Sequence, residues 1–273
     1  MTATDRIGVL PRIGYGTWQR NGDEARACTS AALEAGYRHI DTAEGYGNEE
    51  SVGTAIKESG LARDALFVTT KVKPEHLGPG QVRPAAEASL ERLGLERVDL
   101  LLVHWPSVGD EYAIEDYLGQ FAAVKEAGLT THIGVSNFTK RHMDRAVEIL
   151  GAENIATNQV EIHPLMQNRP IVEHCRALGI PNTAYCPLAR GEVMGNAVME
   201  QIAGAHDATV AQVTLAFLLA EGHVVIPTSS KPEHIAANLR ALDLSLTEAE
   251  MEDIRGLDEG RRLVSGSWAP EFD

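Results

Sequence analysis

Short apolar segments rich in β-branched residues recur along the chain and alternate with longer segments of helical periodicity. The apolar segments are Arg12–Gly16, Tyr37–Asp41, Leu66–Lys71, Val98–His104, His132–Ser136, Ala156–Glu161, Pro181–Tyr185 and Val224–Pro227. Within Val98–His104 the apolar residues form a continuous run, which is typical of a strand buried on both faces of a parallel sheet. The pattern therefore predicts parallel strands covered by helices.

The segments between these strands predict helices, because a glycine follows most of their ends and apolar positions recur at helical spacing. They are Asp23–Ala35, Asn48–Ser59, Gly80–Leu93, Ile114–Ala127, Thr139–Leu150, Arg169–Leu178, Thr209–Glu221 and Lys231–Ala241. Further helices are predicted at Asn196–His206 and Thr247–Arg255, and Asp23 and Asn48 are candidate N-terminal caps.

Strand–helix units repeated eight times in a chain of 273 residues predict an α/β fold, the closed (β/α)8 TIM barrel. A doubly wound open sheet is the structural alternative. No Pro/Ser-rich linker divides the chain, so we expect residues 1–273 to form a single domain.

The chain is strongly acidic, since 24 Lys and Arg residues against 39 Asp and Glu residues give a formal net charge of −15. We therefore expect neither nucleic acid nor a membrane surface as a partner, and an anionic ligand would need a local positive environment. No apolar stretch is long enough to span a bilayer, and Met1–Pro11 lacks a signal-peptide pattern, so we expect a cytoplasmic protein. Cys28, Cys175, Cys186 and the ten histidines show no disulfide or metal-ligand spacing, so no metal is expected.

Polar residues gather where the predicted strands end, which in a (β/α)8 barrel is the face that carries the active site. Asp41, Lys71 and His104 each end a strand, and Tyr46 follows Asp41 closely. The other strands end in or lead into Ser136, Asn137, Asn158, Gln159, Glu161, Tyr185, Thr228, Ser229, Ser230 and Lys231. Burying so many polar groups without purpose is costly, so we expect them to share a pocket.

Taken singly, Asp41 could be an ion-pair or cap carboxylate, Tyr46 a half-buried aromatic and His104 a core histidine. Together with Lys71 they suit carbonyl chemistry. A tyrosine of pKa about 10 is a poor acid at neutral pH, but a cation about 4 Å away at an effective dielectric near 20 contributes about 4 kcal/mol. We therefore expect Lys71 to lower the pKa of Tyr46 into the working range and Asp41 to hold Lys71 charged.

His104 would donate a hydrogen bond to a substrate carbonyl or relay a proton to Tyr46. The group is suited to protonating a carbonyl oxygen while hydride arrives at the carbon. G-x-G-x-x-G and P-loop motifs are absent, so a nicotinamide cofactor would bind without a Rossmann fold. H-E-x-x-H and G-x-S-x-G are absent too, which removes the commonest metalloprotease and α/β-hydrolase readings.

Several motifs in register resemble the aldo-keto reductase superfamily. They are Gly14–Trp18, Asp41–Ala43 with Tyr46, Gly47–Glu49, Thr70–Lys71, Val103–Pro106 and Ile133–Phe138. The ending, with Arg262–Ser265 and Ala269–Glu271, resembles the bacterial 2,5-diketo-D-gluconate reductases of the B type. The resemblance implies a (β/α)8 fold, an NADPH cofactor, carbonyl reduction by a monomer, and Asp41, Tyr46, Lys71 and His104 as the catalytic group.

The same resemblance implies a set of binding residues. Ser136, Asn137 and Gln159 would hold the nicotinamide carboxamide, and Tyr185 would stack on the nicotinamide ring. Pro187, Leu188, Ala189 and Gly191 would lie over the pyrophosphate, with Gly16, Thr17 and Ile226 also on the cofactor, and Trp18, Trp105 and Trp268 would line the substrate pocket.

The segment implied to bind the adenine end departs from the family pattern. Thr228 and His234 replace the lysine and arginine that usually hold the 2′-phosphate, and a neutral histidine cannot make the bidentate phosphate contact of arginine. We expect Ser229, Ser230 and Lys231 to bind that phosphate with the help of the N-terminus of the following helix, and Asn238 closes the implied motif. The predicted cofactor is therefore NADPH with a weakened preference, and NADH is an alternative.

The expected substrates are small aldehydes, α-dicarbonyls such as methylglyoxal, or keto-sugar acids such as 2,5-diketo-D-gluconate. Two alternatives stay open at this point. One is a Schiff-base lyase or aldolase that uses Lys71, which an ion pair with Asp41 would disfavour by holding the amine charged. The other is a non-catalytic NADPH-binding subunit.

Overall fold

The computed structural model describes residues 6–273 and contains a sheet of eight parallel strands, each paired with the next. The strands are β3 (Tyr15–Gly16), β4 (His39–Asp41), β5 (Phe67–Val72), β6 (Val98–Val103), β7 (Thr130–Ser136), β8 (Ile155–Glu161), β9 (Asn182–Tyr185) and β10 (Val224–Val225). The first and last strands also meet, since Ile13 pairs in parallel with Val225 and Gly14 N donates to Val225 O at 2.8 Å. The sheet closes on itself, which confirms the predicted barrel and rules out the open sheet.

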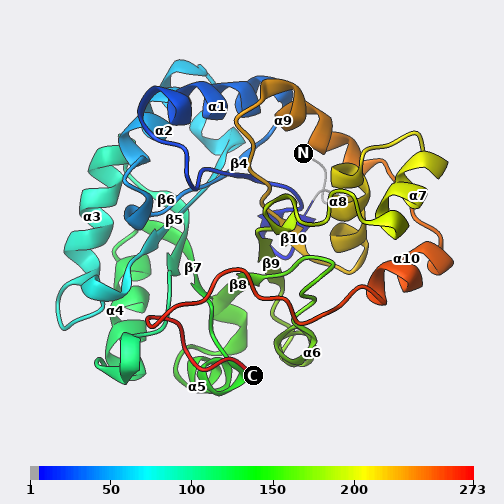
Figure 1. The fold of residues 1–273 in the computed structure, drawn as a ribbon. Coiled ribbons are helices and arrows are strands. Elements are labelled where there is room, and N and C mark those ends of the chain that lie inside the picture. The colour runs from blue at the N-terminus through cyan, green and yellow to red at the C-terminus, as the bar shows by residue number, and fades with distance from the viewer. Residues whose placement is uncertain (1–5) are drawn as a thin grey trace.

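Helices ring the sheet, as Figure 1 shows. They are α1 (Gly22–Ala35), α2 (Glu49–Glu58), α3 (Val82–Leu93), α4 (Ile114–Glu126), α5 (Lys140–Leu150), α6 (Arg169–Ala177), α7 (Ala197–Ala205), α8 (Val210–Ala220), α9 (Pro232–Asn238) and α10 (Glu248–Arg255). Each matches a predicted helix, although the segment predicted as Lys231–Ala241 changes from α9 to a 3-10 turn at Leu239.

Of the two predicted caps, Asn48 occupies its predicted position and Asp23 does not. Asn21 occupies the N-terminal cap of α1, so Asp23 lies inside the first turn rather than before it. Asn48 does precede α2, but its side chain makes no cap hydrogen bond and reaches the loop after β3 instead.

The surroundings of strand β6 explain why its sequence is almost continuously apolar. Leu100 and Leu102 belong to a small cluster with Phe67, whereas Leu101 and Val103 pack into the main core. Alternate residues therefore face two different apolar surroundings, as expected for a strand buried on both faces.

An N-terminal hairpin that the sequence did not predict pairs β1 (Arg6–Ile7) with β2 (Leu10–Pro11). Leu10 packs against Phe67, Leu100 and Val224, which lie at or near the starts of their strands. The hairpin thus covers the end of the barrel opposite the strand carboxyl ends. Strands of two residues carry no periodicity, so pattern analysis cannot find them.

The C-terminal tail after α10 crosses the mouth of the barrel (Figure 1). The buried Glu161 carboxylate accepts hydrogen bonds from Leu263 N at 2.6 Å and Val264 N at 3.0 Å. At the far end, the Asp273 side chain accepts one from Lys140 N at 2.8 Å. Strand β8 and the start of α5 therefore hold the tail in place over the mouth.

Within residues 6–273, no single helix is both long and apolar enough to cross a membrane. Helices α7 and α8 reach the required length only as a pair, and the pair is bent by 90°. All three cysteines are unpaired, and across the described part of the chain no group of three or more metal-ligating side chains comes together.

Candidate active site

A cavity of about 610 Å³ opens at the carboxyl ends of the strands, within the range of roughly 300–1,000 Å³ typical of small-molecule sites. Its wall includes Asp41 at the end of β4, Tyr46 after β4, His104 after β6, and Tyr185 at the end of β9. The predicted convergence on one barrel mouth is therefore present for these residues, whereas the cavity wall does not include Asn158, Glu161, Ser229, Ser230 or Lys231.

Lys71 lies behind this wall, fully buried, with three acceptors around its ammonium group. Its Nζ donates to Asp41 Oδ1 at 2.5 Å, to the carbonyl oxygen of Thr42 at 2.8 Å, and to the Tyr46 hydroxyl at 3.2 Å. An ammonium group has three N–H donors, so none is left over. The arrangement fixes the lysine and directs its charge at the phenol.

The pKa values of this group follow from its burial and its contacts. Burial acts against the charged lysine, but Asp41 and Tyr46 outweigh it, so the pKa of Lys71 lies above its ordinary value. Burial raises the pKa of the Tyr46 phenol, and the opposing Lys71 charge does not cancel this effect. The prediction that Lys71 brings the pKa of Tyr46 down to the working range is therefore wrong, although the sign of the lysine's effect is as predicted.

His104 stands against Tyr46, with ring centroids 5.5 Å apart and ring planes at 76°. Burial and the nearby Lys71 charge lower its pKa to about 3. The imidazole is therefore neutral at any working pH and does not serve as a charged proton relay. What it offers to the cavity is one N–H donor.

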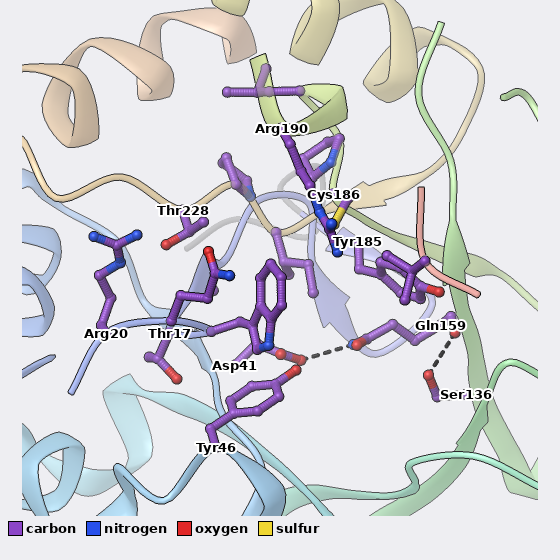
Figure 2. A pocket seen from close by; sticks show the side chains of 18 of the residues that line it. Thr17, Arg20, Asp41, Tyr46, Ser136, Gln159, Tyr185, Cys186, Arg190 and Thr228 are labelled. Atoms are coloured by element: carbon purple, nitrogen blue, oxygen red, sulfur yellow. Dashed lines mark hydrogen bonds between the residues drawn. The ribbon is translucent and has the colours of Figure 1, made fainter. Parts of the chain in front are cut away.

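A hydrogen-bond network joins the ends of β7, β8 and β9 beside this group, and Figure 2 shows the bonds that join Gln159 to Asp41 and to Ser136. Gln159 Nε2 donates to Asp41 Oδ2 at 2.8 Å, and Ser136 Oγ donates to the Gln159 carbonyl oxygen at 2.8 Å. Asn137 Nδ2 donates to Ser136 Oγ and to the carbonyl oxygen of His104, while Asn137 Oδ1 accepts from the Tyr185 hydroxyl at 2.8 Å. The network fixes these side chains relative to Asp41.

Most residues predicted to bind the cofactor lie in the cavity wall. They are Gly16, Thr17, Ser136, Asn137, Gln159, Tyr185, Pro187, Leu188, Gly191, Ile226 and Thr228. Gly16 is needed where it stands, because a Cβ there would lie 2.9 Å from the carbonyl oxygen of Ile226.

Six other predicted cofactor residues do not line the cavity, namely Ala189, Ser229, Ser230, Lys231, His234 and Asn238. Ala189 is fully buried against Leu165 and Val193, so its side chain adds nothing to the cavity wall. Ser230, Lys231 and His234 are exposed at the start of α9, and Asn238 is buried at its end.

The three tryptophans predicted to surround the substrate all line the cavity. Trp105 and Trp268 meet edge to face with ring centroids 4.4 Å apart. Trp18 carries the guanidinium group of Arg190 over its ring at 4.9 Å. The tail thus contributes one aromatic wall of the mouth through Trp268.

The comparison with known proteins agrees with this geometry. The sequence matches the Aldo/keto reductase family over residues 12–259. The chain belongs to this family.

Similar aldo-keto reductases cover nearly the whole chain. Methylglyoxal reductase DkgB of Escherichia coli O157:H7 is 44% identical over 97% of this chain and 100% of its own length. An aldo-keto reductase of Mycolicibacterium vanbaalenii is 46% identical over 93% of this chain and 91% of its own. A solved structure described as a putative 2,5-diketo-D-gluconic acid reductase B has a TM-score of 0.92 and 36% identity, covering 97% of this chain and 94% of that one.

As an aldo-keto reductase, the protein is an oxidoreductase that reduces carbonyl groups with a nicotinamide cofactor. The Schiff-base alternative does not fit the site. Lys71 is absent from the cavity wall and all its protons are engaged, so its amine can neither reach a substrate nor act as a nucleophile.

Several residues of this aldo-keto reductase line the cavity although the sequence predicted no role for them. They are Gln19, Arg20, Cys186 and Met194. For Arg20 the only available signal was its place just beyond the end of β3. Met194 and Cys186 lie on the irregular segment after β9, whose path no sequence pattern indicates.

Proposed function

We propose that this protein is an NADPH-dependent reductase of small aldehydes and α-dicarbonyls, with Tyr46 as the proton donor. The observation that carries the proposal is the Tyr46 hydroxyl, held 3.2 Å from a buried, ion-paired lysine at the mouth of the cavity.

A nicotinamide cofactor held in this cavity would supply hydride to the carbonyl carbon. Tyr46 gives its proton to the carbonyl oxygen as negative charge develops there. The raised pKa of Tyr46 is compatible with this role, because a developing alkoxide is a far stronger base than a phenolate. Lys71 stabilises the phenolate that remains, and Asp41 keeps Lys71 charged and oriented. The neutral His104 donates a hydrogen bond that orients the carbonyl oxygen.

The residues around the cavity fit the cofactor that this chemistry needs. Thr17 and Thr228 carry buried hydroxyl oxygens with no hydrogen-bond partner among residues 6–273, which a polar ligand would satisfy. Ser136, Asn137 and Gln159 would hold the carboxamide, and the Tyr185 ring would stack on the nicotinamide. The loop Pro187–Gly191 would lie over the pyrophosphate.

We assign a modest preference for NADPH over NADH. Thr228 and His234 supply no permanent cation, so the 2′-phosphate would rely on Ser229, Ser230 and Lys231. The side chain of Ser229 already accepts a hydrogen bond from Lys231 N at 3.1 Å, which shapes this turn. The ratio of kcat/KM for the two cofactors tests the assignment, and a clear NADH preference would overturn it.

The substrate proposal draws on the aromatic mouth and on the relatives. Trp18, Trp105 and Trp268 form a pocket suited to small carbonyl compounds such as methylglyoxal or 2,5-diketo-D-gluconate. We further propose that residues 1–273 act as one domain, as a cytoplasmic monomer, without nucleic acid, membrane or metal partners.

A panel of carbonyl compounds followed by NADPH absorbance tests the proposed function. We expect turnover with methylglyoxal, with 2,5-diketo-D-gluconate, or with both. Tight NADPH binding without turnover of any carbonyl would instead favour the non-catalytic subunit.

A further inference from the structure

Two cations lie in the wall of the cavity, and they differ in how well their nitrogen atoms are satisfied. Among the lining residues only Arg20 and Arg190 are lysine or arginine. The Arg190 guanidinium stacks over Trp18. Arg20 has a buried Nε with no hydrogen-bond partner in residues 6–273. A buried guanidinium nitrogen without an acceptor is unfavourable, unless a ligand supplies one.

Two unsatisfied hydroxyls lie in the same wall. Thr17 Oγ1 and Thr228 Oγ1 are buried and also lack partners among the described residues. Figure 2 shows Arg20, Thr17 and Thr228 on one side of the pocket. The two chain segments are adjacent, because Gly16 N donates to the carbonyl oxygen of Pro227 at 3.0 Å. Three unmet polar groups in one wall indicate a place for a polar ligand.

The backbone of this wall is fixed. Asn48, nearly fully buried, donates from Nδ2 to the carbonyl oxygens of Thr17 at 2.9 Å and Arg20 at 2.7 Å. Arg20 N donates to the carbonyl oxygen of Thr17 at 3.1 Å, which closes the turn. The loop therefore presents its side chains from a rigid frame.

The present partner of Arg20 is replaceable. Arg20 Nη1 pairs with Glu24 at 2.8 Å, and the Glu24 side chain is 49% exposed. Exposed ion pairs of this kind contribute little, so an anion with better geometry can displace Glu24. The guanidinium fork matches a phosphate group in two places at once.

We propose that Arg20, with the hydroxyls of Thr17 and Thr228, forms a phosphate subsite for the dinucleotide. Arg20 then supplies the cation that Thr228 and His234 do not. The inference rests on the proposed function, since it assumes a nicotinamide dinucleotide in the cavity. The phosphate is either the 2′-phosphate, which NADPH alone carries, or the pyrophosphate, which NADPH and NADH share.

The test is the dissociation constant of NADPH and of NADH, measured by quenching of tryptophan fluorescence, in wild type and Arg20→Gln. We expect NADPH to bind at least about 10-fold more weakly to the variant, the loss typical of a charge-assisted hydrogen bond. Weakening of NADPH alone assigns the 2′-phosphate, and equal weakening of both nucleotides assigns the pyrophosphate.

Arg26→Gln is the matched control. Like Arg20→Gln, it removes one positive charge from the protein. Arg26 lies on α1, where it pairs with Glu58 on the exposed surface away from the cavity. We expect it to leave both dissociation constants unchanged. A loss of affinity equal to that of Arg20→Gln would reduce the effect to overall charge and overturn the subsite.

Glu24→Gln gives a test of opposite sign that does not depend on removing Arg20. Freeing Arg20 from its competitor should tighten NADPH binding by about 2- to 5-fold, the value of an exposed ion pair. The gain should vanish in the Arg20→Gln background, because the two residues act through one contact. A purely structural role of Arg20 predicts no gain.

The inference fails if Arg20→Gln binds NADPH and NADH each as tightly as wild type does, and the proposed function then stands. If wild type binds neither nucleotide, both fail together. Thermal unfolding of each variant checks that the affinities belong to folded protein.

Discussion

At the Tyr46 end of the cavity every N–H of Lys71 has a partner within the protein. At the Thr228 end two buried hydroxyls and one guanidinium nitrogen have none in the part of the chain that the structure describes. The first arrangement is complete before any ligand arrives. The second is completed only by what binds there. The groups that face the charge developing on the substrate carbonyl are held in place before the substrate binds. The groups that recognise the far end of the cofactor gain their hydrogen-bond partners only when the cofactor binds.

The largest expected effect comes from the preorganised end. Tyr46→Phe removes the proposed proton donor but keeps the ring, so kcat should fall by about 10²- to 10⁴-fold while NADPH affinity stays nearly unchanged. Steady-state kinetics and fluorescence titration measure the two quantities. Tyr112→Phe, outside the cavity, is the control. A near-normal kcat in Tyr46→Phe would refute the role.

The second prediction concerns stability at the same end. Lys71→Met leaves the Asp41 carboxylate buried without its cation, so the free energy of unfolding should drop by about 3–5 kcal/mol. Urea denaturation measures it. Lys57→Met, on the exposed face of α2, should change the value by less than about 0.5 kcal/mol. Equal losses for both variants would show that the buried pair has no special role.

The third prediction concerns a double variant that adds permanent cations to the Thr228 end of the cavity. Thr228→Lys combined with His234→Arg supplies permanent cations there, so the NADPH dissociation constant should fall about 10-fold. The NADH constant serves as the internal control and should hold steady, because NADH lacks the 2′-phosphate. Parallel gains for both nucleotides would place that phosphate elsewhere.

The smallest expected effect concerns His104, which should not titrate in the pH profile of kcat/KM. Because burial and Lys71 lower the pKa of His104 to about 3, kcat/KM for reduction should show no histidine inflection between about pH 5 and 8. An inflection near pH 6.5 that disappears in His104→Gln would contradict a neutral imidazole.

The same shift has a consequence for stability. An unfolded histidine has a pKa of about 6.5, so the stability due to neutral His104 is fully present above that pH. It is lost as the pH falls from about 6.5 toward 3, because only the unfolded chain then takes up the proton. Denaturant midpoints between pH 7 and 5 should therefore decline less steeply in His104→Gln than in wild type.

The barrel and the Tyr46 end were predictable because their signals are local. Buried parallel strands read as apolar runs, and Asp41, Lys71 and His104 lie at or next to the ends of three of them, so the strand ends alone bring these side chains together. The hairpin β1–β2 was not predictable, since its strands are too short to show a period.

Electrostatic outcomes were harder to predict than positions. The sequence indicates a cation near Tyr46 but not how deeply the phenol is buried, and burial decides the direction of its pKa shift. Arg20 was missed for a similar reason. Its proposed role depends on an unmet Nε in a loop whose start, Gly16, is hydrogen-bonded to Pro227, more than 200 residues away, and only the folded chain brings these segments into contact.

The most direct test of the central claim uses NADPH carrying deuterium as the transferable hydrogen at C4, with methylglyoxal as the carbonyl. Mass spectrometry and NMR of the product locate the label in wild type and in Tyr46→Phe. We predict one deuterium on the new carbinol carbon in wild type and a strongly slowed but identical pattern in the variant. A carbinol hydrogen drawn from solvent, or no product from NADPH-saturated wild type with any carbonyl tested, would contradict direct reduction at this barrel mouth.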